Sequence, residues 1–147
     1  MAHVRQTIRS NITTTLTGLT TTGSNVFQTR FYPLSENKLP ALGIYCKTDT
    51  GEYESVTKPR TVQHQAEYSV EIYAKATANV ENTIDTITTE VSEALVTDLT
   101  RGGNAKDTKV TDFNFDFNSE GDQPVAVAVL TILVDYATLE TDVESAI

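Results

Sequence analysis

The spacing of apolar residues changes near residue 78, and this change constrains the fold more than any other feature of the sequence. Residues 61–76 alternate between apolar and polar side chains, which is the pattern of a half-buried β-strand. Beyond residue 79, apolar side chains recur every three or four positions, as on one face of an α-helix. They are Val80, Ile84, Ile87, Val91 and Leu95. A strand followed at once by an amphipathic helix predicts a sheet with helices packed against it.

A second helical stripe lies near the start of the chain. It consists of Val4, Ile8, Ile12, Leu16 and Leu19. Gly18 or Gly23 is expected to end this helix, because glycine favours turns. For the helix that begins near Val80, Asn79 is the expected N-cap and Gly102-Gly103 the expected stop.

Four further segments are predicted to be strands. They are Asn25–Phe31, Ala41–Lys47, Lys109–Asn118 and Pro124–Thr138. The last is apolar on both faces, which indicates a central strand covered on both sides. The resulting order, α-β-β-β-α-β-β, predicts an α+β fold. We expect a two-layer sandwich in which two helices pack on one face of a mostly antiparallel or mixed sheet.

The whole chain, 1–147, is expected to form one domain, because no linker or internal repeat divides it. A long hairpin tip or mobile loop is expected at about 48–60, and an acidic tail, frayed or docked on a neighbour, at about 139–147. Pro33 and Pro40 bracket the segment between the first two strands. Proline lacks a backbone donor, so Pro33 should end one strand. Pro40 should fix an extended backbone at the start of the next.

Charge and cysteine content argue against several classes of function. The chain has 11 basic and 20 acidic residues, a net charge of -9. Proteins that wrap nucleic acid need clustered Lys and Arg, so specific DNA binding is not expected. Cys46 is the single cysteine, which excludes an internal disulfide. The N-terminus does not read as a secretory signal, and no apolar run is long enough for a membrane-spanning helix, so a cytoplasmic protein is expected.

The segment Asp112–Asp122 places acidic and amide residues two positions apart, which is the spacing of the first ligands in a calcium loop. Such a loop also needs Gly at its sixth position and Glu at its twelfth, where this chain has Phe117 and Gln123. The interleaved phenylalanines instead predict a strand with an aromatic inner face and a polar outer face. No metal or cofactor is expected.

A catalytic pair would need Cys46 or a serine close to His3 or His64. His3 lies at the terminus, and His64 lies in a polar stretch. Cys46 is within a predicted strand, where a buried and inert thiol is usual. We therefore expect that Cys46, His64 and a carboxylate do not gather in a pocket, and that the protein is not an enzyme.

Several stretches occur along the chain in a characteristic order: VRQTIRSNITTTLTGL, NVFQTRFYPLSENKLPALGIYC, EYSVEIYAKA, VENTIDTITTEVSEAL and the ending VDYAT. Together they resemble the tail terminator proteins of long-tailed, non-contractile bacteriophages (siphoviruses), the family of the lambda-type minor tail protein U. The resemblance covers about residues 4–138 and rests on element order and on the Leu-Pro-Ala-Leu and Val-Glu-Ile-Tyr stretches.

The resemblance implies a structural protein that performs no chemistry. Such proteins form a hexameric ring on the finished tail tube, stop further tube polymerisation and offer a surface to the head–tail connector. The genome passes through the bore without specific binding. The implied partners are other copies of the chain, the tail tube protein and a connector or neck protein, with no membrane. The implied location is the head-proximal end of the virion tail, after assembly in the cytoplasm of the host bacterium.

This reading assigns roles to two sets of residues. The expected subunit or tube interface consists of Tyr32, Pro33, Pro40, Tyr53, Lys58 and Arg60. In particular, Lys58 and Arg60 are expected to pair with acids of a neighbouring subunit, because basic residues are scarce. The acids expected to face the DNA bore, where they would repel DNA weakly, are Glu67, Glu71, Asp112 and Asp116.

Two alternatives stay open at this point. The chain can be another virion protein, either a neck or head–tail joining protein or the tail tube subunit, which would polymerise by itself into long tubes. It can also be a small cytoplasmic enzyme, which would require Cys46, His64 and a carboxylate within hydrogen-bonding reach.

Overall fold

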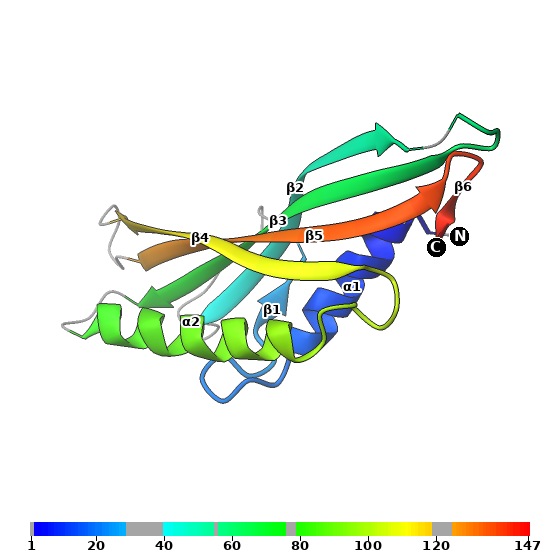
Figure 1. Ribbon diagram of the computed structural model, residues 1–147. Helices are drawn as coiled ribbons and strands as arrows, with labels where there is room; N and C mark the ends of the chain where they lie inside the picture. Colours follow the sequence, from blue (N-terminus) through cyan, green and yellow to red (C-terminus); the bar gives the residue numbers. More distant parts are fainter. Residues whose placement is uncertain (1, 29–39, 55, 76–78, 119–124) are drawn as a thin grey trace.

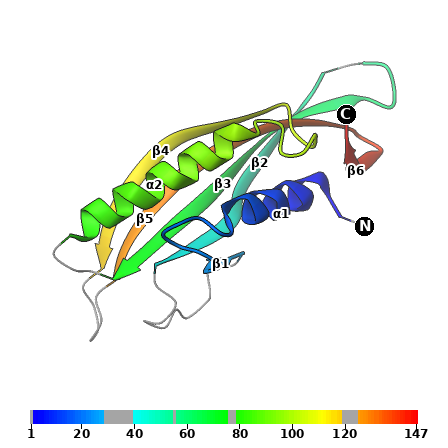
Figure 2. The same cartoon turned by 90° about the horizontal axis from the view of Figure 1, so that it is seen from below.

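The computed structural model describes residues 2–28, 40–54, 56–75, 79–118 and 125–147. Its elements are α1 (Val4–Leu16), β1 (Val26–Phe27), β2 (Ala41–Tyr53), β3 (Thr61–Lys75), α2 (Val80–Thr97), β4 (Asp107–Asn118), β5 (Val125–Leu139) and β6 (Asp142–Ala146). The predicted order of helices and strands is confirmed, with β6 added at the C-terminal end. Both helices lie on the same face of the sheet (Figures 1 and 2).

The strands form one mixed sheet in the order β1-β2-β3-β5-β4, with β6 paired to β5. β3 lies between β2 and β5 and is antiparallel to both. Its pairing with β5 runs from Thr61 opposite Leu139 to Lys75 opposite Val125. β1 pairs with β2 in parallel. The predicted α+β sandwich is therefore confirmed.

The core lies between the two helices and the inner face of the sheet. The predicted stripe residues of α1 from Val4 to Leu16 and those of α2 from Val80 to Leu95 are each at most 7% exposed. Each such buried side chain contributes about 1.5–3 kcal/mol relative to an exposed one. This burial offsets the low helix propensity of the threonines in α1. Two threonine hydroxyls donate to carbonyls one turn earlier: Thr13 in the helix to Arg9, and Thr17 at the C-cap to Thr13.

Three predicted boundaries were wrong. β1 comprises only Val26–Phe27, so Gln28 is not part of the strand, and residues 29–31 of the expected strand lie outside the described residues. β2 continues to Tyr53, because residues 48–53 pair with residues 62–67 of β3. The acidic tail contains β6, which pairs with the end of β5 instead of fraying. Local sequence patterns do not show these differences, because strand ends depend on the pairing partner.

The two faces of β5 differ in their cover. Its inner residues, such as Ile132, are buried, whereas Val127, Val129 and Leu133 on the outer face are only half-buried. β5 is therefore interior within the sheet, but the helices cover one face of it and not both (Figure 2). The expectation of a strand covered on both sides was wrong.

β4 is a strand, as the sequence predicts for Lys109–Asn118, and it forms one edge of the sheet. Phe113 pairs opposite Leu130 and Phe115 opposite Ala128, so both rings lie on the inner face as expected. They are nevertheless 42% and 38% exposed. Because β4 is an edge strand, the two rings lie at the border of the helical layer and remain partly exposed.

The ends of α2 also differ from expectation. Asn79 occupies the N-cap position, but its side chain forms no capping hydrogen bond. The helix ends at Thr97, before Gly102-Gly103. The fully buried Arg101 donates to the carbonyls of Leu95 and Asp98. The Arg101 side chain thus provides hydrogen bonds to carbonyl groups that have no partner within the helix.

Candidate functional site

The β2–β3 hairpin extends past the helices at one end of the molecule and carries three of the predicted interface residues (Figure 1). Tyr53 is 58% exposed, and the guanidinium of Arg60 lies 4.5 Å from the centre of its ring. Val56, between them in sequence, is 95% exposed, and Lys58 is exposed as well. Aromatic, aliphatic and basic side chains at a protruding tip form a surface suited to contact another protein.

Arg60 is already paired within its own chain. Its backbone N donates to Glu140 Oε2 at 3.0 Å, and its Nε donates to the same oxygen at 2.5 Å. The hydrogen bond from Arg60 lowers the pKa of Glu140 below its usual value. The expected acid partner of Arg60 is therefore found at the turn between β5 and β6 of the same chain. Lys58, by contrast, forms no salt bridge with any residue that the structure describes.

Pro40 lies directly before β2. Its carbonyl accepts a hydrogen bond from Asn25 Nδ2 at 3.5 Å, and Leu42 N donates to the Asn25 carbonyl at 2.9 Å. These contacts join the entry of β2 to the start of β1. Tyr32 and Pro33 lie outside the described residues, so their part in an interface stays a prediction.

The acids predicted to face the DNA bore can be placed on the sheet. The register with β5 puts Glu67, Glu71 and Asp112 on the face opposite the helices. Glu67 is half-exposed and Asp112 exposed, whereas Glu71 is 8% exposed and accepts a hydrogen bond from the Tyr73 hydroxyl. Asp116 lies in β4, and its side chain is outside the described part of the chain. The open face therefore presents Glu67 and Asp112 to solvent.

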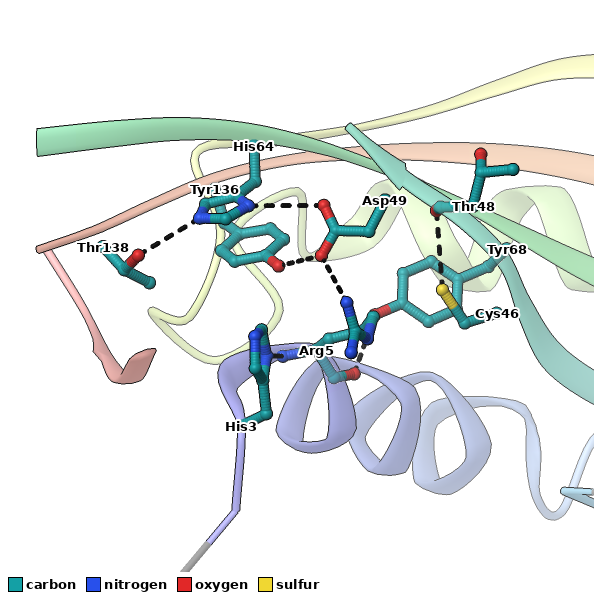
Figure 3. A network of polar contacts seen from close by, with 9 residues as sticks. All are labelled: His3, Arg5, Cys46, Thr48, Asp49, His64, Tyr68, Tyr136 and Thr138. Atoms are coloured by element: carbon teal, nitrogen blue, oxygen red, sulfur yellow. Dashed lines mark hydrogen bonds and ion pairs between the residues drawn. The ribbon is translucent and has the colours of Figure 1, made fainter. Parts of the chain in front are cut away.

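A polar network that sequence reasoning missed joins α1 to the hairpin (Figure 3). Its centre is Asp49 in β2, whose side chain is 7% exposed. Asp49 Oδ2 accepts hydrogen bonds from Arg5 Nη1, at 2.9 Å, and from the Tyr136 hydroxyl. His64 Nδ1 lies 3.4 Å from Asp49 Oδ1, and the His64 ring stacks on Tyr136 with ring centres 4.5 Å apart. Four elements, α1, β2, β3 and β5, therefore meet at one carboxylate.

Two tyrosine hydroxyls in this network stay protonated and act as hydrogen-bond donors. Burial raises the pKa of Tyr136, and its hydrogen bond to Asp49 raises it further. Burial likewise raises the pKa of Tyr68, whose hydroxyl donates to the Arg5 carbonyl at 2.7 Å. Both phenols therefore remain protonated across the physiological range. No motif marks these residues, because the register of β2, β3 and β5 brings them together from distant positions.

The network contains part of the constellation considered for catalysis. One carboxylate, that of Asp49, lies beside His64. The third member does not join them through a hydrogen bond, since Cys46 Sγ donates to the Thr48 carbonyl at 3.5 Å. Burial raises the pKa of the Cys46 thiol, which disfavours the nucleophilic thiolate. The arrangement serves as a structural link between helix and hairpin.

Two further properties concern the described residues only. Within them, no group of three His, Cys, Asp or Glu side chains is placed to hold a metal ion. No helix in the described ranges is long and apolar enough to cross a membrane.

Comparisons with known proteins add an independent finding. A family model described as phage minor tail protein U matches residues 3–136. No curated protein matches the sequence. Among solved structures, a chain from the virion of a native gene transfer agent particle is similar at 14% sequence identity and a TM-score of 0.44. The match covers 90% of this chain and 92% of that chain.

Proposed function

Because the chain belongs to the phage minor tail protein U family, we propose that it is a tail terminator. In this role a ring of six copies caps the tail tube, stops tube polymerisation and provides the surface that joins the tail to the head connector. The family match over residues 3–136 carries the proposal, and it supports a structural role in a phage tail rather than an enzymatic one. The site of action would be the head-proximal end of the tail in the virion.

Ring formation fits the distribution of exposed residues. A ring closes through head-to-tail contacts, so each subunit needs two different surfaces that complement each other. The hairpin tip with Tyr53 and Lys58 supplies one protruding surface. The segment between the first two strands, with Tyr32, Pro33 and Pro40, is the second place where we propose a subunit or tube contact.

Passage of DNA fits the charge of the protein. A net charge of -9 makes the surface repel phosphate, which favours sliding over binding. We propose that the sheet face left open by the helices, with Glu67 and Asp112, is turned toward the bore. Asp116 belongs to the same proposal, whereas the burial of Glu71 leaves it little contact with a passing polyanion.

The test is assembly with the tail tube protein. We expect the purified chain, alone or mixed with tube protein, to give hexameric rings by light scattering and negative-stain microscopy. We also expect one ring at a tube end and an arrest of tube growth. Phages that lack the protein should carry overlong tails that do not join heads.

Two results would overturn the proposal. Self-polymerisation of the pure protein into long tubes would identify a tube subunit. A protein that stays monomeric with tube protein present, in a phage whose tails have normal length without it, would not be a terminator.

A further inference from the structure

A groove between α2 and β4 combines exposed aromatic rings with acids. It has a volume of about 220 Å³ and is lined by Glu81, Asp85, Phe113 and Phe115. We call it the α2/β4 groove. Both carboxylates are exposed, and both rings keep more than a third of their surface open although they lie on the helix-covered side of the sheet. Large exposed apolar side chains that gather in a groove mark a contact surface.

The hairpin tip has the complementary composition. Tyr53 and Val56 are the most exposed apolar side chains of the hairpin. Lys58 adds a positive charge that forms no salt bridge with a described residue, although this charge helps to lower the pKa of Glu140. The groove thus offers aromatic rings and negative charge, while the tip offers an aromatic ring, an aliphatic side chain and positive charge. Such complementarity sets which surfaces meet and suppresses wrong pairings.

The two surfaces lie at opposite ends of the molecule. The hairpin tip extends beyond the end of the sheet where α1 begins, whereas the start of α2 lies at the other end (Figure 1). A single copy therefore cannot place its own tip in its own groove. A contact between the tip of one copy and the groove of the next is head-to-tail, and contacts of this kind can close a ring.

We propose that the hairpin tip of one copy (Tyr53, Val56 and Lys58) docks into the α2/β4 groove of a second copy of this chain. Tyr53 packs against Phe113 and Phe115, and the Lys58 ammonium faces the carboxylates of Glu81 and Asp85. The pair between Arg60 and Glu140 stays intact and holds the Tyr53 ring in place through the guanidinium. This inference rests on the proposed ring and names the surfaces that build it.

The first experiment is site-directed crosslinking. In a Cys46→Ser background, Val56→Cys is combined with Phe115→Cys, which leaves Tyr53, Lys58 and both acids in place. Mild oxidation, with tube protein present if assembly requires it, is expected to give a ladder of covalent multimers that a reducing agent collapses. The matched control pairs Val56→Cys with Glu93→Cys, an exposed position on α2 outside the groove. It should assemble without forming covalent multimers.

The second experiment uses complementation between two defective variants. A tip variant carries Tyr53→Ala and Lys58→Glu, and a groove variant carries Asp85→Lys and Phe113→Ala. Each variant alone should associate at least about tenfold more weakly than the parent, as expected for loss of an aromatic anchor. An equimolar mixture retains one intact tip and one intact groove per pair, so we expect dimers and no rings. Glu93→Lys, with the same charge change outside the groove, should assemble normally.

The outcomes separate this inference from the proposed function. Rings without a crosslink, or rings formed by the tip and groove variants, would overturn the inference and leave the terminator proposal standing. A crosslink that captures tube protein instead of a second copy would also overturn it. Crosslinked copies that grow into open filaments would support the contact and contradict the terminator role. Monomers under every condition would overturn both.

Discussion

At the scale of single residues, Asp49 carries the most connections in the polar network. Its side chain is nearly buried and contacts Arg5, His64 and Tyr136 from three other elements. A buried carboxylate is tolerated only when charged and polar partners replace its water. Gly51 pairs opposite His64, and a Cβ there would lie 3.2 Å from Val62 Cγ1, which is close, and 3.5 Å from His64 Nδ1, which is an ordinary contact.

We expect Asp49→Asn to lower the free energy of unfolding by about 1–3 kcal/mol, because the charge-assisted bonds to Arg5 and Tyr136 are lost while the shape is kept. Urea unfolding followed by circular dichroism measures this change. Asp142→Asn, at an exposed position in β6, is the matched control and should leave the unfolding midpoint unchanged. Equal midpoints for the two variants would show that the network does not stabilise the fold.

Cys46 should react slowly with thiol reagents. Burial raises the pKa of its thiol, so the folded protein retains the proton and little thiolate forms near pH 8. The stability linked to this proton is present below the pKa of the unfolded thiol and is lost as pH rises from there through the raised pKa of the folded thiol. We expect labelling by a chromogenic disulfide to be several times slower in buffer than in urea. Equal rates would contradict a shielded thiol.

At the scale of elements, the salt bridge between Arg60 and Glu140 connects the base of the hairpin tip to the turn that precedes β6. The backbone contributes as well, since Glu140 N donates to the Arg60 carbonyl at 2.8 Å. The tip can therefore protrude while its base stays fixed. A fixed base reduces the conformational entropy lost when the tip binds a partner.

We expect Glu140→Gln to speed amide hydrogen exchange in the hairpin, residues 48–65, with little change in the core strands. Because Arg60 lowers the pKa of Glu140, the interaction is present above the pKa of the unfolded carboxyl and is lost as pH falls through the folded value. Acidification of the parent protein should therefore lower the same protection factors. Glu144→Gln, in β6 and exposed, serves as the control.

The stripe of α2 supplies much of the contact between helix and sheet. Ile87 is fully buried, so Ile87→Ala should lower the free energy of unfolding by about 2–5 kcal/mol through lost burial and a residual cavity. Val96→Ala on the same helix, at a side chain that is 50% exposed, should cost less than about 0.5 kcal/mol. Chemical denaturation of both variants measures the difference. A small effect at Ile87 would contradict the observed packing.

At the scale of the whole molecule, charge and shape together bear on function. The helices cover one face of the sheet and leave the other open, and that open face carries Glu67 and Asp112. An acidic lining would keep a passing polyanion from binding, which suits a conduit for DNA.

We expect phages that carry Glu67→Lys with Asp112→Lys to assemble tails of normal length but to lose infectivity per particle by about tenfold, because a basic lining retains phosphate. Electron microscopy measures tail length, and plaque counts per particle measure infectivity. Glu93→Lys with Asp142→Lys makes the same charge change outside the open face. Equal infectivity of the two variants would place Glu67 and Asp112 away from the bore.

Several features of this protein were determined by the sequence alone. The stripes Val4–Leu16 and Val80–Leu95, and the alternation in residues 61–75, predicted both helices, β3 and the α+β class, all of which are confirmed. These patterns are reliable because a helix or a half-buried strand must repeat its apolar residues with its own geometric period. The ordered stretches also indicated the family that the match over residues 3–136 shows.

The tertiary structure alone decided the rest. It extended β2 to Tyr53, formed β6 from the tail, buried Glu71 and brought His64 to Asp49. It also exposed Phe113 and Phe115 at the edge of the sheet, where the α2/β4 groove lies. Each of these depends on which strand pairs with which, and in what register. Pairing joins residues far apart in the chain, and no local period encodes it.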